Sequence, residues 1–193
     1  MIGKKDIEEL FGSLLSRISD NELRSSVVDV WVKACKRGGW ETVEELKNIP
    51  FTLLTDSRGI DLIEHTIVVT WGALALGKAQ TENYAEIPYK INFDRLIAGG
   101  LLHDVGKLLE ITSDGKGNYR KSRAGQCARH PISGAILAAE SGLSDEIVNI
   151  IACHAKEGEG RPQVIETVLI HQADFSTFNP LVMLQKNQLI LEE

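Results

Sequence analysis

The feature that most constrains this chain is an ionisable pair inside an apolar segment. His103 and Asp104 lie in the middle of residues 99–109, which read GGLLHDVGKLL. A buried carboxylate needs a cation or a dense shell of hydrogen-bond donors, because an isolated charge in an apolar interior is very costly. A metal ion would supply that cation. For these two residues taken alone, a hydrogen-bonded pair in the core is the simpler interpretation.

The residues around this pair predict a helix that another helix crosses closely. Asn92 is expected to cap its start. Neighbouring side chains on a helix point about 100° apart, so the pair can converge on one ion, and Lys107, one turn further on, would overhang it. Gly99 and Gly100 would each weaken the helix by about 1 kcal/mol. A close helix crossing at this point explains their presence.

Two other histidines lie in helical segments before and after this pair. His65 stands among apolar residues of the helix predicted over residues 60–79, where a lone histidine is more often a core residue than a ligand. Asp61, one turn earlier, either holds that imidazole or is a solvent-facing acid favoured by the helix dipole. His130 begins a later predicted helix, with Pro131 at its first position.

The last third of the chain holds three more candidates. A helix beginning at Asp145 is predicted to run to His154, and a final core helix after Pro162 carries His171 and Asp174. Because His171 and Asp174 are three residues apart, they share one face of that helix and are rival ligands. Their spacing alone does not choose between them.

Taken in chain order, these candidates form the pattern His65, His103-Asp104, His130, His154 and Asp174, with HDVGK at residues 103–107. The pattern resembles the HD-domain superfamily of metal-dependent phosphohydrolases, over residues 60–178. The resemblance implies an all-α fold, a helical bundle around one or two metal ions. It also implies six ligands, with Asp104 bridging two ions. His65, His103 and Asp174 would complete the first site, and His130 and His154 the second.

This implied ligand set has a definite chemistry. Four imidazoles and two carboxylates make a mixed nitrogen and oxygen site, which suits Fe, Mn, Zn, Ni or Co. Many single-metal relatives lack counterparts of His130 and His154, so their presence favours two ions. Two cations about 3.5 to 4 Å apart convert water to hydroxide and neutralise the oxygens of a phosphoryl group. Asp104 and Lys107 would then be catalytic, and Lys107 would also hold a phosphate oxygen of the substrate.

The segment that contains Arg161 bears on the substrate. Residues 154–162 resemble the HD-GYP subgroup, which acts on cyclic dinucleotides, but Ala155 follows His154 in place of a second histidine, and Arg161 replaces the tyrosine. That subgroup's substrate is therefore not expected. Arg161 is a candidate substrate contact, and a capped surface arginine is the alternative.

Three functions fit these features, and we rank a phosphohydrolase first. It would cleave a phosphate mono- or diester, with a nucleotide or cyclic nucleotide as the expected substrate. The second is a di-iron oxygenase acting on a small polyol or phosphonate, because relatives in the superfamily use a similar ligand set. The third, a non-catalytic signalling domain, ranks last because all six ligand positions are filled.

Length and patterning predict one compact unit made of three parts. In this chain of 193 residues, residues 1–58 are expected to form a helical cap and residues 59–178 the metal-binding domain. Residues 179–193 form an apolar tail that packs on the domain or on a second subunit, so a homo-oligomer is one outcome. Within the cap, Ser19 and Glu22 form a capping-box signature that predicts the start of the second helix.

Charge limits the partners of the chain. The net charge of −6 argues against an extended nucleic-acid surface. Residues 105–129 nevertheless hold six basic residues against two acidic ones, which suits a small phosphorylated substrate or a solvated loop. Asp-Gly and Gly-Asn pairs in residues 112–121 predict a short loop or hairpin, either a lid over the substrate or a passive connector.

Nothing in the sequence predicts a membrane segment. No apolar run reaches transmembrane length, and residues 1–9 lack the apolar stretch of a signal peptide. The three cysteines, Cys35, Cys127 and Cys153, are widely spaced and are expected to be reduced thiols. A cytoplasmic protein is the resulting prediction.

Overall fold

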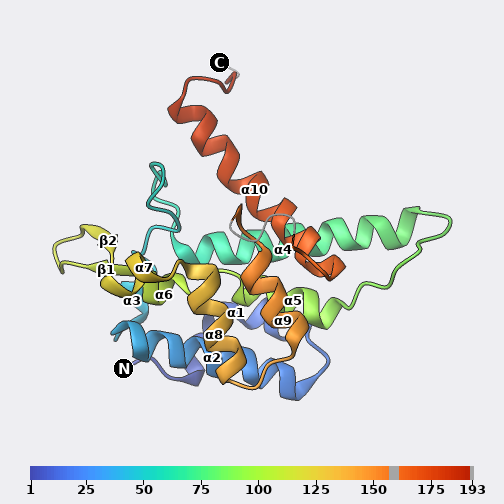
Figure 1. The fold of residues 1–193 in the computed structure, drawn as a ribbon, viewed down its shortest axis with the longest axis horizontal. Helices are drawn as coiled ribbons and strands as arrows, with labels where there is room; N and C mark the ends of the chain where they lie inside the picture. The colour runs from blue at the N-terminus through green and yellow to red at the C-terminus, as the bar shows by residue number, and fades with distance from the viewer. Residues whose placement is uncertain (157–160, 192–193) are drawn as a thin grey trace.

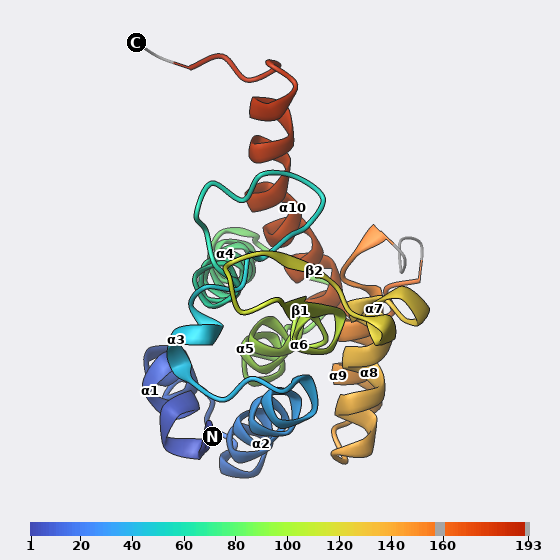
Figure 2. The same cartoon turned by 90° about the vertical axis from the view of Figure 1, so that its left-hand side faces the viewer.

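The prediction of an all-α fold is confirmed. The computed structural model describes residues 1–156 and 161–191, and within them the chain forms helices and one two-stranded hairpin (Figures 1 and 2). The elements are α1 (Lys4–Leu15), α2 (Asn21–Gly38), α3 (Val43–Leu46), α4 (Leu62–Asn83), α5 (Phe93–Leu102), α6 (Lys107–Glu110), β1 (Ile111–Ser113), β2 (Tyr119–Lys121), α7 (Arg123–Cys127), α8 (His130–Glu140), α9 (Asp145–Cys153) and α10 (Ile165–Gln185).

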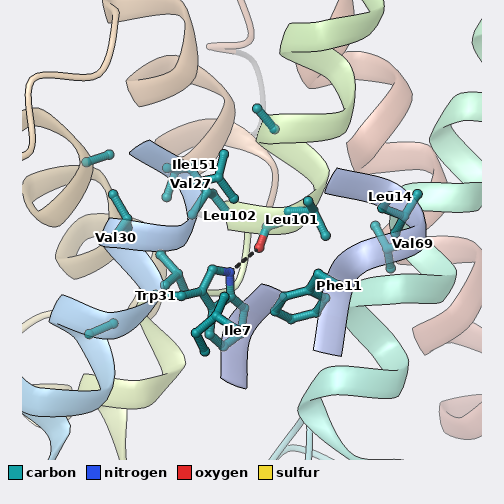
Figure 3. Close-up of a cluster of buried hydrophobic side chains, with 14 of the residues drawn as sticks. Ile7, Phe11, Leu14, Val27, Val30, Trp31, Val69, Leu101, Leu102 and Ile151 are labelled. Atoms are coloured by element: carbon teal, nitrogen blue, oxygen red, sulfur yellow. Dashed lines mark hydrogen bonds between the residues drawn. The ribbon is translucent and has the colours of Figure 1, made fainter. Parts of the chain in front are cut away.

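The first two helices pack against the segment that carries His103 and Asp104. Figure 3 shows the buried cluster in which Phe11 and Trp31 meet, with ring centroids 4.9 Å apart. The indole N–H of Trp31 donates a hydrogen bond to the carbonyl of Leu101 (2.9 Å), and that of Trp40 donates to the carbonyl of Leu108 (2.8 Å). Two tryptophans of the N-terminal region therefore fix the backbone on either side of the ionisable pair.

The start of α2 differs from the sequence prediction. Asp20, not Ser19, caps the helix, and its carboxylate accepts hydrogen bonds from the backbone N–H groups of Glu22 (2.9 Å) and Leu23 (3.0 Å). The predicted capping box fails because the N–H of Ser19 donates to a carboxylate oxygen of Asp94 in α5 (3.0 Å). This long-range bond shifts the cap by one residue. It also joins α2 to the start of α5.

The close helix crossing predicted at Gly99 and Gly100 is confirmed. A Cβ atom on Gly99 would lie 2.7 Å from the side chain of Ile150 in α9, and one on Gly100 would lie 2.8 Å from the hydroxyl of Thr70 in α4. Asn92 caps α5 as predicted, since its side chain accepts from a first-turn N–H. The helix thus touches α4 and α9 at the two positions where it lacks side chains.

The hairpin expected within residues 112–121 is present, with Ile111 of β1 paired with Lys121 of β2 in an antiparallel register. Gly115 and Gly117 in the connecting turn have positive φ angles of 74° and 86°. This conformation disfavours side chains with a Cβ atom, so glycine is suited to both positions. The hairpin brings Lys121 back alongside α6.

The C-terminal helix is longer than the sequence suggests. Helix α10 packs on α4, continues through Pro180 and extends beyond the body of the molecule (Figures 1 and 2). The boundary expected between residues 178 and 179 therefore falls inside a helix. Near the end of α10, the Thr55 hydroxyl donates to the side-chain carbonyl of Gln185 (2.6 Å). Across residues 1–156 and 161–191, no helix combines the length and hydrophobicity needed to span a bilayer.

We predict that Gly106→Ala destabilises the protein. The added methyl group would lie 2.1 Å from the carbonyl oxygen of His130 and 2.7 Å from the backbone nitrogen of Gly134, so backbone would have to move. Overpacking of this kind costs about 1–3 kcal/mol.

Gly12→Ala is the matched control, because a Cβ atom in this part of α1 meets nothing within 4 Å. Alanine is favoured over glycine inside a helix by roughly 0.5–1 kcal/mol, so the free energy of unfolding should rise. Urea denaturation followed by circular dichroism measures both variants. Equal stability of the two variants would contradict the close contact at Gly106.

Candidate metal centre

Six side chains from five segments of the chain meet at the centre of the helical body. They are His65 in α4, His103 and Asp104 between α5 and α6, His130 at the start of α8, His154 directly after α9, and Asp174 in α10. All are buried except Asp174, whose side chain is 15% exposed. These are the six residues singled out from the sequence.

The helix expected to carry the ionisable pair ends sooner than predicted. Helix α5 stops at Leu102, and residues 103–106 form turns before α6 begins at Lys107. His103 therefore follows the last turn of α5, as His154 follows the last turn of α9. Both positions lie beside carbonyl groups that have no partner within the helix.

Asp104 is at the middle of the group. Its Oδ2 atom lies 3.2 Å from Nε2 of His65 and 3.3 Å from Nε2 of His103. Its Oδ1 atom lies 3.2 Å from Nε2 of His130 and 3.6 Å from Nε2 of His154. The carboxylate thus faces one pair of imidazoles with each oxygen. Asp174 joins the first pair, with its Oδ1 3.2 Å from Nε2 of His65.

The other ring nitrogen of each imidazole shows which one carries the proton. Nδ1 of His103 lies 2.6 Å from the carbonyl of Gly100, and Nδ1 of His154 lies 2.8 Å from the carbonyl of Ile151. A carbonyl can only accept, so both Nδ1 atoms donate, and a neutral ring then carries a lone pair on Nε2. Nδ1 of His130 donates in the same way to Glu110 Oε2 (2.8 Å).

His65 completes the set through a hydroxyl group. Nδ1 of His65 lies 3.3 Å from the hydroxyl oxygen of Thr177, and that hydroxyl donates its only hydrogen to the carbonyl of Asp174 (2.7 Å). The oxygen can then only accept, so His65 Nδ1 donates as well. Phe51 stacks on the imidazole of His65, with ring centroids 4.3 Å apart. The geometry thus assigns a lone pair on Nε2 to every neutral imidazole of the group.

This arrangement fits a bound cation. Lone pairs of the imidazoles face the oxygens of a carboxylate, and acceptors do not stabilise each other without a positive charge between them. Among the described residues, four buried atoms lack a hydrogen-bond partner: His65 Nε2, His103 Nε2, His154 Nε2 and Asp104 Oδ1. Two overlapping sets have metal-binding geometry, namely His65, His103 and Asp104, and Asp104, His130 and His154.

The protonation states also suit metal binding. Burial would raise the pKa of Asp104, but the ammonium group of Lys107 holds it well below its usual value. Burial lowers the pKa of His130 to about 4, with Glu110 opposing the shift. At neutral pH the Asp104 carboxylate is ionised and His130 is neutral, as ligands must be.

A cavity of about 420 Å³ adjoins this centre. One part of its wall is apolar and aromatic, and another part carries cationic side chains. The Lys107 ammonium group pairs with Asp104 Oδ2 and lies 5.5 Å from the centre of the Phe51 ring. The lining residues are Phe51, Thr52, Leu53, Leu54, Lys107, Glu110, Ile111, Lys121, Arg129, His130, Ala155, Lys156, Asp174, Phe175 and Phe178.

Arg161 does not belong to this cavity wall. It is exposed, and its carbonyl accepts from the side-chain amide of Asn149 (3.4 Å). Its role in substrate binding stays a prediction. Gly160, which belongs to the segment compared with the Gly-Tyr-Pro motif, lies outside the described residues.

For two candidates the structure decides between the alternatives that the sequence left open. Asp61 does not hold His65. Its carboxylate caps α4 by accepting from the N–H groups of Ile63 (2.7 Å) and Glu64 (2.8 Å). His171 donates from Nδ1 to the carbonyl of His154 (2.6 Å), so it lies behind the centre, while its rival Asp174 faces His65.

Sequence reasoning missed Glu110, Thr177 and Phe51. Glu110 lies within the basic segment and reads as one acid among lysines and arginines. In the structure it is buried, and although burial raises its pKa, contacts with His130 and Arg129 lower that pKa to about 2. The sequence did contain one indication of its role: Glu110 lies three residues after Lys107, in a helix next to the ionisable pair.

A family model of the HD domain matches residues 62–176. The chain belongs to the HD-domain family. It is 30% identical over 172 residues to a dihydroneopterin 2',3'-cyclic phosphate phosphodiesterase of Methanocaldococcus jannaschii, covering 83% of this chain and 65% of that protein. It is 32% identical over 118 residues to ribonuclease Y of Thermotoga maritima, covering 61% of this chain but 18% of the ribonuclease. No solved structure matches the chain significantly.

Proposed function

We propose that this HD-domain protein is a metal-dependent phosphohydrolase that cleaves a phosphate ester of a nucleotide-like molecule. The observation that supports this most is the Asp104 carboxylate, which faces imidazole Nε2 atoms with both of its oxygens. That geometry suits a carboxylate shared between two divalent cations. Family membership and the two relatives, one a cyclic phosphate phosphodiesterase and the other a ribonuclease, point to the same class of reaction.

In this proposal the six converging side chains would divide between two ions of Fe, Mn, Ni, Co or Zn. His65, His103 and Asp174 would hold one, His130 and His154 would hold the other, and Asp104 would contribute to both. When bound, such ions lower the pKa of water and offset the negative charge of a phosphoryl group. The surrounding apolar helices exclude bulk water, which strengthens every charge interaction inside the centre.

Lys107 is the residue best placed to act on the phosphate. Its ammonium group sits between Asp104 and the cavity, so it can hold a phosphate oxygen while the ester bond breaks. Lys121, Arg129 and Lys156 add positive charge along the same cavity. We assign substrate phosphate contacts to these residues rather than to the exposed Arg161.

The cavity also favours a particular shape of substrate. Phe51, Phe175 and Phe178 offer aromatic surface against which a flat heterocyclic base can stack. A volume of about 420 Å³ accommodates one nucleoside phosphate rather than a long strand. We therefore propose a cyclic phosphodiester of a single nucleoside-like molecule as the substrate.

The cellular setting remains a prediction from the sequence. The three cysteines are free thiols in the structure, which is compatible with the predicted cytoplasmic location. Homo-oligomer formation also stays a prediction.

Anaerobic hydrolysis assays test the proposed reaction. Purified protein supplied with Mn²⁺, Co²⁺ or Fe²⁺ should open 2',3'-cyclic nucleotides or cleave bis(p-nitrophenyl) phosphate without oxygen. Asp104→Ala should lose turnover and bound metal together. Substrate-dependent oxygen uptake with iron, on a polyol or phosphonate, would favour the oxygenase alternative instead. Full turnover by the Asp104→Ala variant would contradict the role of this carboxylate.

We predict that Lys107→Gln lowers kcat by about 10²- to 10³-fold, the loss typical of removing one group that stabilises transition-state charge. Metal content should not fall, because Lys107 is not among the proposed ligands. Lys116→Gln is the matched control, since Lys116 lies in the hairpin turn, is exposed and does not line the cavity. Steady-state kinetics with metal analysis compares the variants, and equal kcat values would exclude the role given to Lys107.

A further inference from the structure

The imidazoles of the centre are oriented by two different kinds of group. Backbone carbonyls take the Nδ1 hydrogens of His103 and His154. Side chains take those of His130 and His65, through Glu110 and Thr177 respectively. Substitution cannot remove a backbone carbonyl, but it can remove these two side-chain acceptors one at a time. Glu110 acts on the imidazole that faces Oδ1 of Asp104, and Thr177 acts on one that faces Oδ2.

Glu110 holds His130 through two hydrogen bonds that a single carboxylate oxygen accepts. Its Oε2 accepts from Nδ1 of His130 (2.8 Å) and from the backbone N–H of the same residue (2.7 Å). The backbone of Glu110 is also held in place. Its carbonyl accepts a hydrogen bond from the N–H of Ser122 (2.8 Å). Gly125 packs closely against the same carbonyl, since a Cβ atom on Gly125 would lie 2.4 Å from its oxygen. A rigid anionic acceptor therefore sets the orientation of His130.

The second oxygen of Glu110 faces the cations of the cavity. Oε1 accepts from Nε of Arg129 (2.9 Å) and lies 3.5 Å from the ammonium nitrogen of Lys121. Arg129 and Lys121 both line the cavity. One buried carboxylate thus holds an imidazole of the centre with one oxygen and two cations of the substrate wall with the other.

Thr177 is a weaker and uncharged counterpart on the opposite side. Its hydroxyl oxygen lies 3.3 Å from Nδ1 of His65, a longer contact than the 2.8 Å between Glu110 and His130. The hydroxyl is held in place because it donates to the carbonyl of Asp174 one turn earlier in α10 (2.7 Å).

We propose that Glu110 and Thr177 are positioning residues that act separately on the two metal sites of this centre. Glu110 fixes the tautomer of His130 and increases its basicity, which strengthens the site on the Oδ1 side of Asp104. Thr177 orients His65 on the Oδ2 side and acts more weakly. Because Glu110 also holds Arg129 and Lys121, its charge couples that metal site to substrate binding. This inference rests on the proposed two-metal centre.

Titration of demetallated protein with Co²⁺ tests the proposal without measuring activity. Calorimetry gives the affinities, and visible absorption reports the coordination of each bound ion. We expect wild type to bind two ions and Glu110→Gln to bind one of them about 10- to 100-fold more weakly, the usual effect of losing an outer partner of a metal ligand. Thr177→Val should weaken the binding of the other ion by a smaller factor. Thr177→Ser, which keeps the hydroxyl group, should bind that ion with wild-type affinity.

Two controls separate positioning from general damage. Glu166→Gln removes another buried carboxylate, one that accepts from the backbone N–H of Asn92 (2.7 Å) and does not line the cavity, so Co²⁺ binding should not change. In a His130→Ala background, Glu110→Gln should weaken Co²⁺ binding no further, because the two residues act through one another. In wild-type background, Glu110→Gln should also raise KM for substrate.

Each outcome of the titration decides a separate point. Wild-type affinity for both ions in Glu110→Gln would overturn the proposal while the phosphohydrolase function stood. Loss of the same ion in Glu110→Gln and Thr177→Val would also overturn it. If wild type bound no Co²⁺, the proposed metal centre itself would fail. Should Glu110→Gln not fold, the Thr177 variants and their Ser rescue still test the Oδ2 side.

Discussion

The structure depends on one unfavourable encounter: a fully buried carboxylate faces the lone pairs of four imidazoles. Asp104 lies within 3.6 Å of each ring, and the hydrogen-bond partners of the rings direct their Nδ1 hydrogens away from it. In a protein interior, such acceptor-to-acceptor contacts are destabilising unless a cation lies between them. The arrangement therefore fits a bound cation between this carboxylate and the rings.

Common features of helices and their packing position these side chains. Backbone carbonyls in the last turns of α5 and α9 accept hydrogen bonds from His103 and His154, each of which lies three residues after its acceptor. Gly99 and Gly100 let α5 approach α9 and α4 closely enough for the centre to close. The indole groups of Trp31 and Trp40 fix the backbone on both sides of Asp104. The N-terminal helices thus contribute to the geometry of the centre although they hold none of the six converging side chains.

The sequence predicted the hairpin from local turn residues. The all-α fold and the convergence of six side chains followed from a resemblance to the HD-domain family, because spacing alone did not choose between His171 and Asp174. Sequence reasoning failed where a distant residue decided the outcome. Asp94 takes the N–H of Ser19 and shifts a helix cap to Asp20, and no local pattern records that contact. Glu110 was hidden for the same reason: its partner His130 lies 20 residues away, across a hairpin. The family resemblance indicated the converging side chains, but the residues that orient them depend on tertiary packing.

In the proposed centre, the two oxygens of Asp104 serve two different metal ions. Anomalous diffraction from crystals grown with Co²⁺, collected above and below the cobalt absorption edge, tests it most directly. We expect two anomalous peaks, one among Asp104, His65, His103 and Asp174 and one among Asp104, His130 and His154. A single peak, or peaks that avoid Asp104 altogether, would contradict it.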